Sequence, residues 1–329
     1  MPENTAFRTR PVTRPRKRVV AITGAANFLG QRLIAALNEH PEVERVVAID
    51  INSVEVEHEK FRFYKVDLSL PNTGSLLTKI FTKEGVDSLM HLIFAFSLAR
   101  RSSLAHELEA IGTMHLLDAC AASGVKKMVL RSSGLVYGAR PENPLFLPET
   151  APLMPTVKTF VADKIEAERQ IKQFVERHAE VSTVVLREGT VLGPHARNHF
   201  IELLKRSMVP KIMGHDPLMQ FIHEDDLVDY YLAALFKNVE GTYNLVAPGV
   251  LRFSEVLDIC HRKTVAIPET FLRIHAALLW TLQLNNVSAD LIPYLKYPMI
   301  MDGSKAEYVL EVRPRYTSRS AVAACASLL

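Results

Sequence analysis

The chain has 329 residues, of which 48% are hydrophobic and 23% charged, and its formal net charge is +3. This length suits one extended domain or two, and this composition is typical of a soluble globular protein. No apolar run reaches the roughly 18–20 residues that span a bilayer, and the N-terminal segment lacks the apolar stretch of a secretory signal. We therefore expect a cytoplasmic protein without a membrane span.

The positive charge is concentrated in the first 18 residues, which carry six Lys or Arg and one Glu. The rest of the chain is slightly negative, which argues against nucleic-acid binding through a basic surface. We expect residues 1–17 to form a disordered basic tail. It either only solubilises the chain or contacts an acidic partner or lipid headgroups.

The cysteines and histidines do not form a metal-binding pattern. Cys120, Cys260 and Cys325 are widely spaced in apolar surroundings, which is typical of reduced packing thiols. His195 and His199 have the spacing of helix-borne metal ligands, but no Cys is nearby and no Glu stands in motif position. We expect no metal site.

The first predicted elements are a strand, a tight turn and a helix. Residues 19–22 form a buried apolar strand, Gly24 turns the chain, and residues 28–37 carry apolar side chains at helical spacing. In such a unit, backbone N–H groups at the helix start bind a pyrophosphate. The next strand, residues 45–50, ends at Asp50, where a carboxylate accepts hydrogen bonds from the adenosine ribose. Because a carboxylate repels a 2′-phosphate, we expect NAD rather than NADP.

Strands and helices continue to alternate as far as residue 186. This alternation predicts an α/β fold with a Rossmann-like, doubly wound parallel sheet. Ligands of such sheets bind beyond the carboxyl ends of the strands, so Gly24, Asp50, Asp67, Leu92 and Ser133 should converge. The further predicted strands are 61–66, 87–93, 127–133 and 181–186, and the further helices are 73–81, 97–122 and 156–177.

Beyond the last of these strands, frequent prolines divide the chain into shorter elements. This pattern predicts a smaller lobe over the mouth of the sheet. We assign residues 18–190 and part of 220–247 to a nucleotide-binding domain, and residues 191–219 and 248–329 to a substrate-binding lobe. Residues 271–284 predict an apolar helix that either packs inside this lobe or faces a lipid or a partner.

Six segments carry the clearest motifs. In chain order they are residues 23–30 (TGAANFLG), 111–117 (IGTMHLL), 132–138 (SSGLVYG), 186–194 (LREGTVLGP), 221–227 (FIHEDDL) and 241–245 (GTYNL). In sequence and in order they resemble the motifs of the extended short-chain dehydrogenase/reductase family, the NAD-dependent epimerase/dehydratase group. The resemblance covers most of the chain.

This resemblance implies a nicotinamide cofactor and a substrate carbonyl or alcohol. In the family a Ser or Thr polarises the substrate oxygen, and a Tyr in a YxxxK helix exchanges the proton. The Lys of that helix holds the nicotinamide ribose and lowers the Tyr pKa. Carried over by position, the Ser is Ser133 and the Lys is Lys164, but the Tyr position holds Phe160.

A phenyl ring has no proton to exchange, and loss of a positioned acid or base typically costs about 10²–10⁴-fold in rate. Catalysis is therefore expected to be altered or lost, whereas cofactor binding is expected to remain. The same carry-over gives the cofactor-binding set Gly24, Asn27, Phe28, Leu29, Gly30, Asp50, Asp67, Leu68, Leu92, Ile93, Ser132, Lys164, Glu188 and Val191.

Three further positions depart from the family pattern. Asn27 replaces the middle Gly of the turn, where Asn would tolerate a positive φ. Ile93 stands where the family usually has a small residue, and it would narrow the nicotinamide region. Glu109 stands where the family's helix often carries an Asn.

Several side chains are candidates for the substrate side. Those that could replace the missing hydroxyl are Tyr137, His199, His223 and Glu188. Arg187 and Arg197 would face the diphosphate of a sugar nucleotide, although Arg197 could equally be a solvated loop charge.

Three functions remain open. The first is an NAD-dependent oxidoreductase or epimerase that acts on a sugar nucleotide or a similar small molecule with a non-standard acid or base. The second is a catalytically inactive nucleotide-binding sensor or scaffold on the same fold. The third is a reductase of an apolar, sterol-like or acyl ketone. The resemblance also implies a homodimer that pairs through the helices predicted at 97–122 and 156–177.

Overall fold

The centre of the molecule is a parallel sheet of seven strands in the order β11-β6-β5-β4-β1-β2-β3. The computed structural model describes residues 17–93, 106–156, 160–282 and 289–327. The strands are β1 Arg18–Thr23, β2 Val43–Asp50, β3 Phe61–Lys65, β4 Ser88–His91, β5 Lys127–Ser133, β6 Ser182–Glu188 and β11 Gly241–Leu245. The α/β prediction is therefore confirmed.

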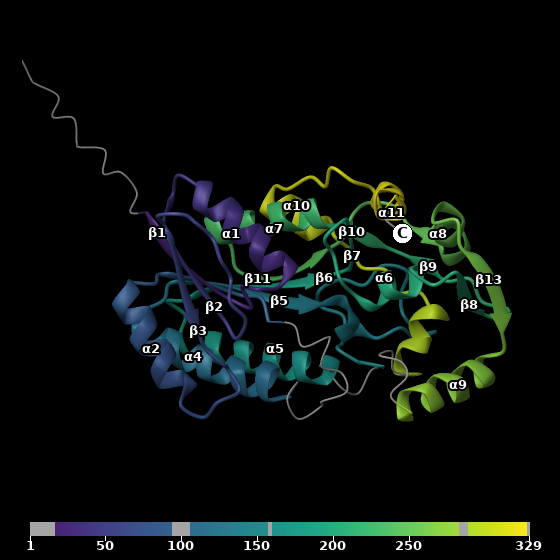
Figure 1. Ribbon diagram of the computed structural model, residues 1–329, viewed down its shortest axis with the longest axis horizontal. Helices are drawn as coiled ribbons and strands as arrows, with labels where there is room; N and C mark the ends of the chain where they lie inside the picture. The colour runs from purple at the N-terminus through teal and green to yellow at the C-terminus, as the bar shows by residue number, and fades with distance from the viewer. Residues whose placement is uncertain (1–16, 94–105, 157–159, 283–288, 328–329) are drawn as a thin grey trace, which may run out of the picture.

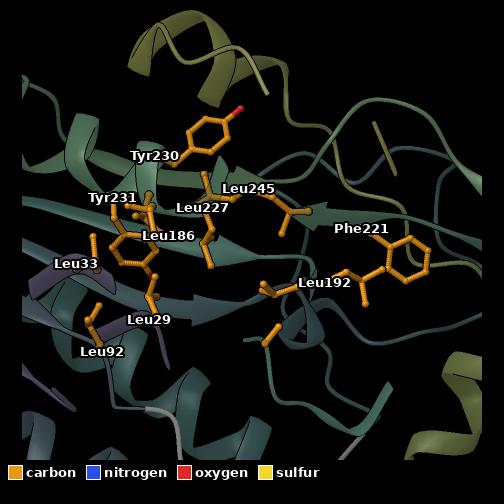
Figure 2. Close-up of a cluster of buried hydrophobic side chains, with 14 of the residues drawn as sticks. Leu29, Leu33, Leu92, Leu186, Leu192, Phe221, Leu227, Tyr230, Tyr231 and Leu245 are labelled. Atoms are coloured by element: carbon orange, nitrogen blue, oxygen red, sulfur yellow. The ribbon is translucent and has the colours of Figure 1, made fainter. Parts of the chain in front are cut away.

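Helices cover both faces of this sheet (Figure 1). On one face lie α1 Phe28–Glu39 and α7 Glu224–Phe236, and on the other lie α2 Thr73–Glu84, α4 Gly112–Ser123 and α5 Phe160–Arg177. Successive side chains of a strand point to opposite faces. Accordingly, Val20 and Ile22 of β1 join the core under α1 and α7, whereas Val19 and Ala21 join the core under the other three helices. Figure 2 shows the first of these clusters, in which side chains of α1 and α7 meet the sheet.

The observed elements follow the predicted ones closely. Thr73 is the first residue of α2, and its hydroxyl donates to the Asp67 carbonyl oxygen. The first part of the helix predicted at 97–122 lies outside the described residues; from residue 106 on, a π-helical turn, η2 Glu107–Ile111, leads into α4. Gly124 ends α4 in the left-handed conformation, with φ +78°.

The shorter elements gather beyond the carboxyl ends of the strands, on the right of Figure 1. Three small two-stranded sheets form here, pairing β7 with β10, β8 with β13 and β9 with β12. The strands are β7 Thr190–Leu192, β8 Met208–Ile212, β9 Leu218–Met219, β10 Phe221–His223, β12 Leu251–Arg252 and β13 Lys263–Ile267. The helices here are α6 His199–Leu204, α8 Phe253–Ile259, α9 Glu269–Thr281, η4 Ala289–Leu295 and α11 Ser318–Ala326. Helix α10 Ser304–Leu310 packs instead against β11 of the central sheet and against α7.

Helix α9 corresponds to the apolar segment predicted in the small lobe. One face packs Leu272 against Ile212 and Ile292. The other face is open, and Phe271 and Ile274 are 67% and 62% exposed. The face that carries Leu272 packs inside the lobe, as the first interpretation expects. The second interpretation, contact with a lipid or a partner, concerns the open face and stays a prediction. In the described part of the chain, no helix has the length and apolar character needed to cross a membrane.

Candidate functional site

The turn between β1 and α1 needs glycine at two positions. Gly24 has φ +73°, a left-handed conformation, and a Cβ there would lie 2.9 Å from the Ile93 nitrogen. A Cβ on Gly30 would lie 2.6 Å from the Ala25 carbonyl oxygen. The turn is therefore packed so closely against β4 and against its own helix that side chains at these positions would force it open.

Asn27 holds this turn in a way that the sequence did not predict. Its φ is −73°, so the expectation of a positive φ is wrong. Instead, Asn27 is the N-cap of α1: its Oδ1 accepts from the Gly30 N–H at 2.9 Å, and its Nδ2 donates to the Leu92 carbonyl at 3.0 Å. The side chain thus ties the helix start to the end of β4. The first-turn N–H groups of Phe28 and Leu29 have no intrahelical acceptor, as at every helix start, and can face an anion.

Two carboxylates stand at the ends of the next strands. Asp50 accepts from the Ala26 N–H at 3.0 Å and from the Asn52 N–H at 2.9 Å, so it fixes the turn from the side of β2. Asp67, beyond β3, accepts from the backbone N–H and hydroxyl of Ser69 at 2.9 and 2.7 Å. Both lie at the carboxyl edge of the sheet, where the sequence analysis expects the adenosine. The adjacent Leu68 is buried.

Ser133 ends β5 and faces the space between the two parts of the molecule. Its hydroxyl accepts from the Leu135 N–H at 3.2 Å, so its own hydrogen remains for another acceptor. The neighbouring Ser132 points the other way and donates to Glu168 on α5 at 2.5 Å. Only Ser133 of this pair lines the interlobe cavity described below.

Lys164 on α5 is buried and ion-paired. Its ammonium lies 2.6 Å from the Glu109 carboxylate, and it donates to the carbonyl oxygens of Ile93 at 2.7 Å and Arg131 at 3.3 Å. Lys164 is 3% exposed and Glu109 is 1% exposed. Three acceptors, one of them charged, therefore surround the ammonium inside the protein. Phe160 is the first residue of α5, but its side chain lies outside the described residues.

A second buried ion pair lies under the cofactor side of the cavity. Glu188 accepts two hydrogen bonds from Arg131, at 2.9 and 3.0 Å, and one from the Tyr231 hydroxyl at 2.7 Å. The Arg131 guanidinium lies 5.7 Å from the centre of the Phe28 ring. These contacts occupy the Glu188 carboxylate, although Glu188 and Val191 both line the cavity.

Three of the candidate substrate residues make contacts within the protein. Arg187 donates to Glu168 at 2.6 Å and to the Tyr137 hydroxyl at 2.8 Å, and that hydroxyl in turn donates to Asn244 at 2.7 Å. His223 caps α7 and stacks on Tyr316 with ring centroids 3.6 Å apart. None of the three is among the described residues that line the cavity.

The other two candidates, Arg197 and His199, do line it. The Arg197 guanidinium donates to the carbonyl oxygens of Pro194 and Ala196, at 3.4 and 3.0 Å. Burial lowers the pKa of His199 to about 4, so its imidazole is neutral at neutral pH. His195 pairs instead with Glu224 at 2.7 Å.

The cavity has a volume of about 580 Å³ and runs from the turn at Asn27 past Ser133 into the small lobe. Most of its lining is aliphatic or aromatic. The lining beyond Ser133 includes Leu135, Phe200, Leu203, Pro210, Leu218, Met219, Phe221, Val246, Leu272, Ala276, Leu279, Leu291, Ile292, Leu295, Met299 and Met301.

Tyr294 is a lining residue that the sequence analysis missed. Its hydroxyl donates to the Leu135 carbonyl oxygen at 2.9 Å, while Ser133 accepts from the N–H of the same residue. Burial raises the pKa of Tyr294, so the hydroxyl stays protonated. No family motif contains this Tyr, and only the packing of η4 brings it into the cavity that Ser133 lines.

A turn that leaves backbone N–H groups open at a helix start, with carboxylates beyond the next two strands, is the site of a dinucleotide-binding protein. The chain matches the NAD dependent epimerase/dehydratase family over residues 20–245. It belongs to that family.

The curated relatives are distant. An uncharacterized protein of Mycobacterium tuberculosis is 27% identical over 311 residues, which cover 92% of this chain and 81% of the relative. The UDP-glucose 4-epimerase of Azospirillum brasilense is 26% identical over 256 residues, which cover 69% of this chain and 71% of that enzyme.

Solved structures share the fold. A UDP-glucose 4-epimerase from Thermotoga maritima, in complex with UDP-glucose, has a TM-score of 0.73 at 19% identity. The match covers 94% of this chain and 98% of the epimerase chain. MoeE5 in complex with UDP-glucuronic acid and NAD has the same TM-score at 22% identity, with the same coverage of both chains.

Proposed function

We propose that the protein binds NAD along the carboxyl edge of the sheet and transfers a hydride between the nicotinamide and a substrate carbonyl or alcohol held next to Ser133. The observation that carries this proposal is the position of Ser133. Its hydroxyl lies in a cavity that also reaches the dinucleotide turn, and it keeps a hydrogen to donate.

The described residues fit the dinucleotide. A Cβ at Gly24 or Gly30 would collide with the backbone of the turn or of the end of β4, so the tight turn needs both glycines, and Asn27 caps the start of α1. Asp50 is placed to accept the ribose hydroxyls. With no Arg directly after it, we propose NAD as the cofactor rather than NADP. When bound, the nicotinamide would supply the hydride as NADH, or accept it as NAD in the reverse direction, and the chain supplies position and protons.

Ser133 donates a hydrogen bond to the substrate oxygen and so polarises it. We assign the proton to Tyr294 rather than to the position of Phe160, because the phenol lines the same cavity as Ser133. Burial raises the pKa of Tyr294, so the phenol enters the reaction protonated and would act as a donor, as the reduction of a carbonyl requires. The hydrogen that now lies on the Leu135 carbonyl oxygen would then pass to the substrate oxygen.

Two measurements test this proposal. Nucleotide released by denaturing the purified protein is identified with its redox state, and single-turnover oxidation of NADH is followed with 2-undecanone, androstenedione and a UDP-4-ketosugar. Ser133→Ala should slow turnover about 10²-fold or more. Tyr294→Phe should slow it about 10²–10⁴-fold, and neither variant should change NADH affinity. The control is Tyr230→Phe, which removes a hydroxyl that bonds to Val312 on the other side of α7. Equal rates in Tyr294→Phe and the control would refute the assignment of the proton.

A second candidate, a nucleotide-binding protein without turnover, is favoured by the Lys164–Glu109 pair. In the family this Lys serves the nicotinamide ribose and the catalytic Tyr, and here a buried carboxylate neutralises it. Tightly bound NADH that none of the three ketones oxidises would favour this function.

The sugar-nucleotide substrate of the sequence analysis is supported by the names of the relatives and by two arginines, Arg197 and Arg206, on the cavity wall. A homodimer through α4 and α5 likewise stays a proposal. Size-exclusion chromatography with light scattering tests it.

A further inference from the structure

We infer that the substrate presents a bulky apolar body to the interlobe cavity, so that its reacting carbonyl or alcohol is attached to a fused-ring or long-chain hydrocarbon rather than to a sugar nucleotide. This inference rests on the proposed function only for the reacting group. The apolar body follows from the cavity itself.

The wall beyond Ser133 is built from apolar side chains of many separate elements. Phe200 and Leu203 come from α6, and Leu218 and Met219 come from β9. Others come from β8, β10, α9, η4 and the segment that holds Met299 and Met301. Because distant parts of the chain all contribute apolar side chains, the apolar surface belongs to the whole cavity and not to one helix.

The polar side chains in this wall are engaged with the protein's own backbone. Asn198 caps α6 and donates to the Val191 carbonyl at 2.7 Å. Gln220 accepts from the Met301 N–H at 3.0 Å and donates to the Ala247 carbonyl at 3.5 Å. These groups hold the wall in place and offer a ligand little new hydrogen bonding.

The charged side chains are paired or peripheral. Arg131 and Glu188 are paired with each other. Arg197, Arg206 and His275 are exposed, which places them at the opening of the cavity. A sugar hydroxyl buried deeper without a partner would lose the hydrogen bonds that it makes with water, whereas a hydrocarbon has none to lose. The volume of about 580 Å³ lies in the usual range for sites that bury a whole small molecule.

Helix α9 offers a matched pair of substitutions, because adjacent residues of a helix are about 100° apart and only one of this pair lines the cavity. Leu279 lines the cavity, whereas Leu278 is 54% exposed on the outer face. Binding of 2-undecanone, androstenedione and UDP-glucose to the NADH-loaded protein is measured by calorimetry. The two ketones should bind and UDP-glucose should not. Leu279→Arg should weaken ketone binding at least about tenfold, because a charge then projects into the apolar wall. Leu278→Arg should leave it unchanged.

Tighter binding of UDP-glucose than of either ketone would overturn the inference, and so would an equal effect of the two arginines. If Leu279→Arg fails to fold, as judged by circular dichroism and NADH binding, Leu279→Ser is used with the same expected order. Ketone binding without NADH oxidation would refute the proposed hydride transfer but leave the substrate class intact. Hydride transfer only to the UDP-4-ketosugar would refute the apolar substrate class but leave the proposed hydride transfer intact.

Discussion

Two regions of the site depart from the family pattern, and the structure treats them differently. At the dinucleotide turn, Asn27 stands in place of a glycine, and its side chain rebuilds the turn through the Gly30 N–H and the Leu92 carbonyl. The second region is the surroundings of Lys164, which we call the catalytic corner after the role proposed for this part of the site. Here Lys164 is retained but faces Glu109 and two carbonyl oxygens inside the protein. The first departure preserves a geometry, whereas the second changes the surroundings of a retained residue.

The difference shows that a residue can depart from a motif and keep the local geometry, or match the motif in different surroundings. Asn27 departs from the motif, yet the turn keeps a helix start open to an anion. Lys164 matches the motif, yet the carboxylate one helix away gives its charge a fixed partner. A residue's match to a family motif is therefore weaker evidence of its role than the atoms that surround its side chain.

The largest expected effect lies at the catalytic corner. Glu109→Ala leaves the buried Lys164 charge without its carboxylate, and breaking a buried ion pair in this way costs about 3–5 kcal/mol of stability. Urea unfolding monitored by circular dichroism measures this loss. The double variant Glu109→Ala with Lys164→Met should recover most of it, because no unpaired charge then remains.

The surface pair of Lys205 with Glu202 provides the control for this prediction. Its side chains are 48% and 56% exposed, so Glu202→Ala should change stability by no more than about 1 kcal/mol. A loss in Glu109→Ala as small as in Glu202→Ala would mean that water reaches Lys164, and the contrast between the two regions would then disappear.

The sequence predicted the fold because its information there is local. Alternating apolar strands and helices, the glycines of the turn and Asp50 lie within short stretches, and the seven-stranded sheet follows from them. Asn27 shows the limit of this argument. Its residue type predicted tolerance of a positive φ, but the acceptor on Leu92 that fixes its actual conformation is 65 residues away in sequence.

The substrate side could not be predicted in the same way. Tyr137 and Arg187 lie in recognisable motifs, but the partners that occupy them, Glu168 and Asn244, come from α5 and β11. Tyr294 lies in no motif and lines the same cavity as Ser133 only through the packing of η4. A cavity wall that many elements share has no periodicity that a sequence would display.

A smaller effect is expected at the turn. Asn27→Ala removes the N-cap of α1, which costs about 1–2 kcal/mol, and also the hydrogen bond to Leu92. NADH affinity should fall about tenfold, because the N–H groups at the helix start are no longer held towards the pyrophosphate. Thermal unfolding and fluorescence titration with NADH measure the two losses.

Asn27→Gly and Asn72→Ala sharpen this prediction. Glycine caps helices nearly as well as asparagine, so Asn27→Gly should bind NADH more tightly than Asn27→Ala. Asn72 precedes α2 but makes no side-chain capping bond, so Asn72→Ala should be close to wild type in both measurements. If Asn27→Ala behaves like Asn72→Ala, the side chain does not compensate for the missing glycine.

The smallest effect concerns His91, which joins the two regions. Its Nδ1 lies 2.6 Å from the Thr23 hydroxyl, next to Gly24, and its Nε2 lies 3.2 Å from the Thr113 hydroxyl, which donates to the Glu109 carbonyl oxygen. Burial, and secondarily the Lys164 charge, lowers the pKa of His91 to about 3. The native state therefore holds this imidazole neutral.

In the unfolded chain His91 binds a proton near pH 6.5, whereas in the native state it does so only near pH 3. Its contribution to the free energy of unfolding is therefore complete above pH 6.5 and is lost as the pH falls towards 3. At pH 5.5 the loss from His91 is about 1.4 kcal/mol. His91→Asn should be less stable at pH 7.5 but should lose less than wild type between pH 7.5 and 5.5, as measured by urea unfolding at each pH. His199, whose pKa is also lowered, titrates in both proteins, so the difference between the two curves isolates His91. Parallel curves would mean that His91 takes up its proton as readily in the native state as in the unfolded chain, so that at pH 5.5 an imidazolium rather than a neutral ring joins the turn and the catalytic corner.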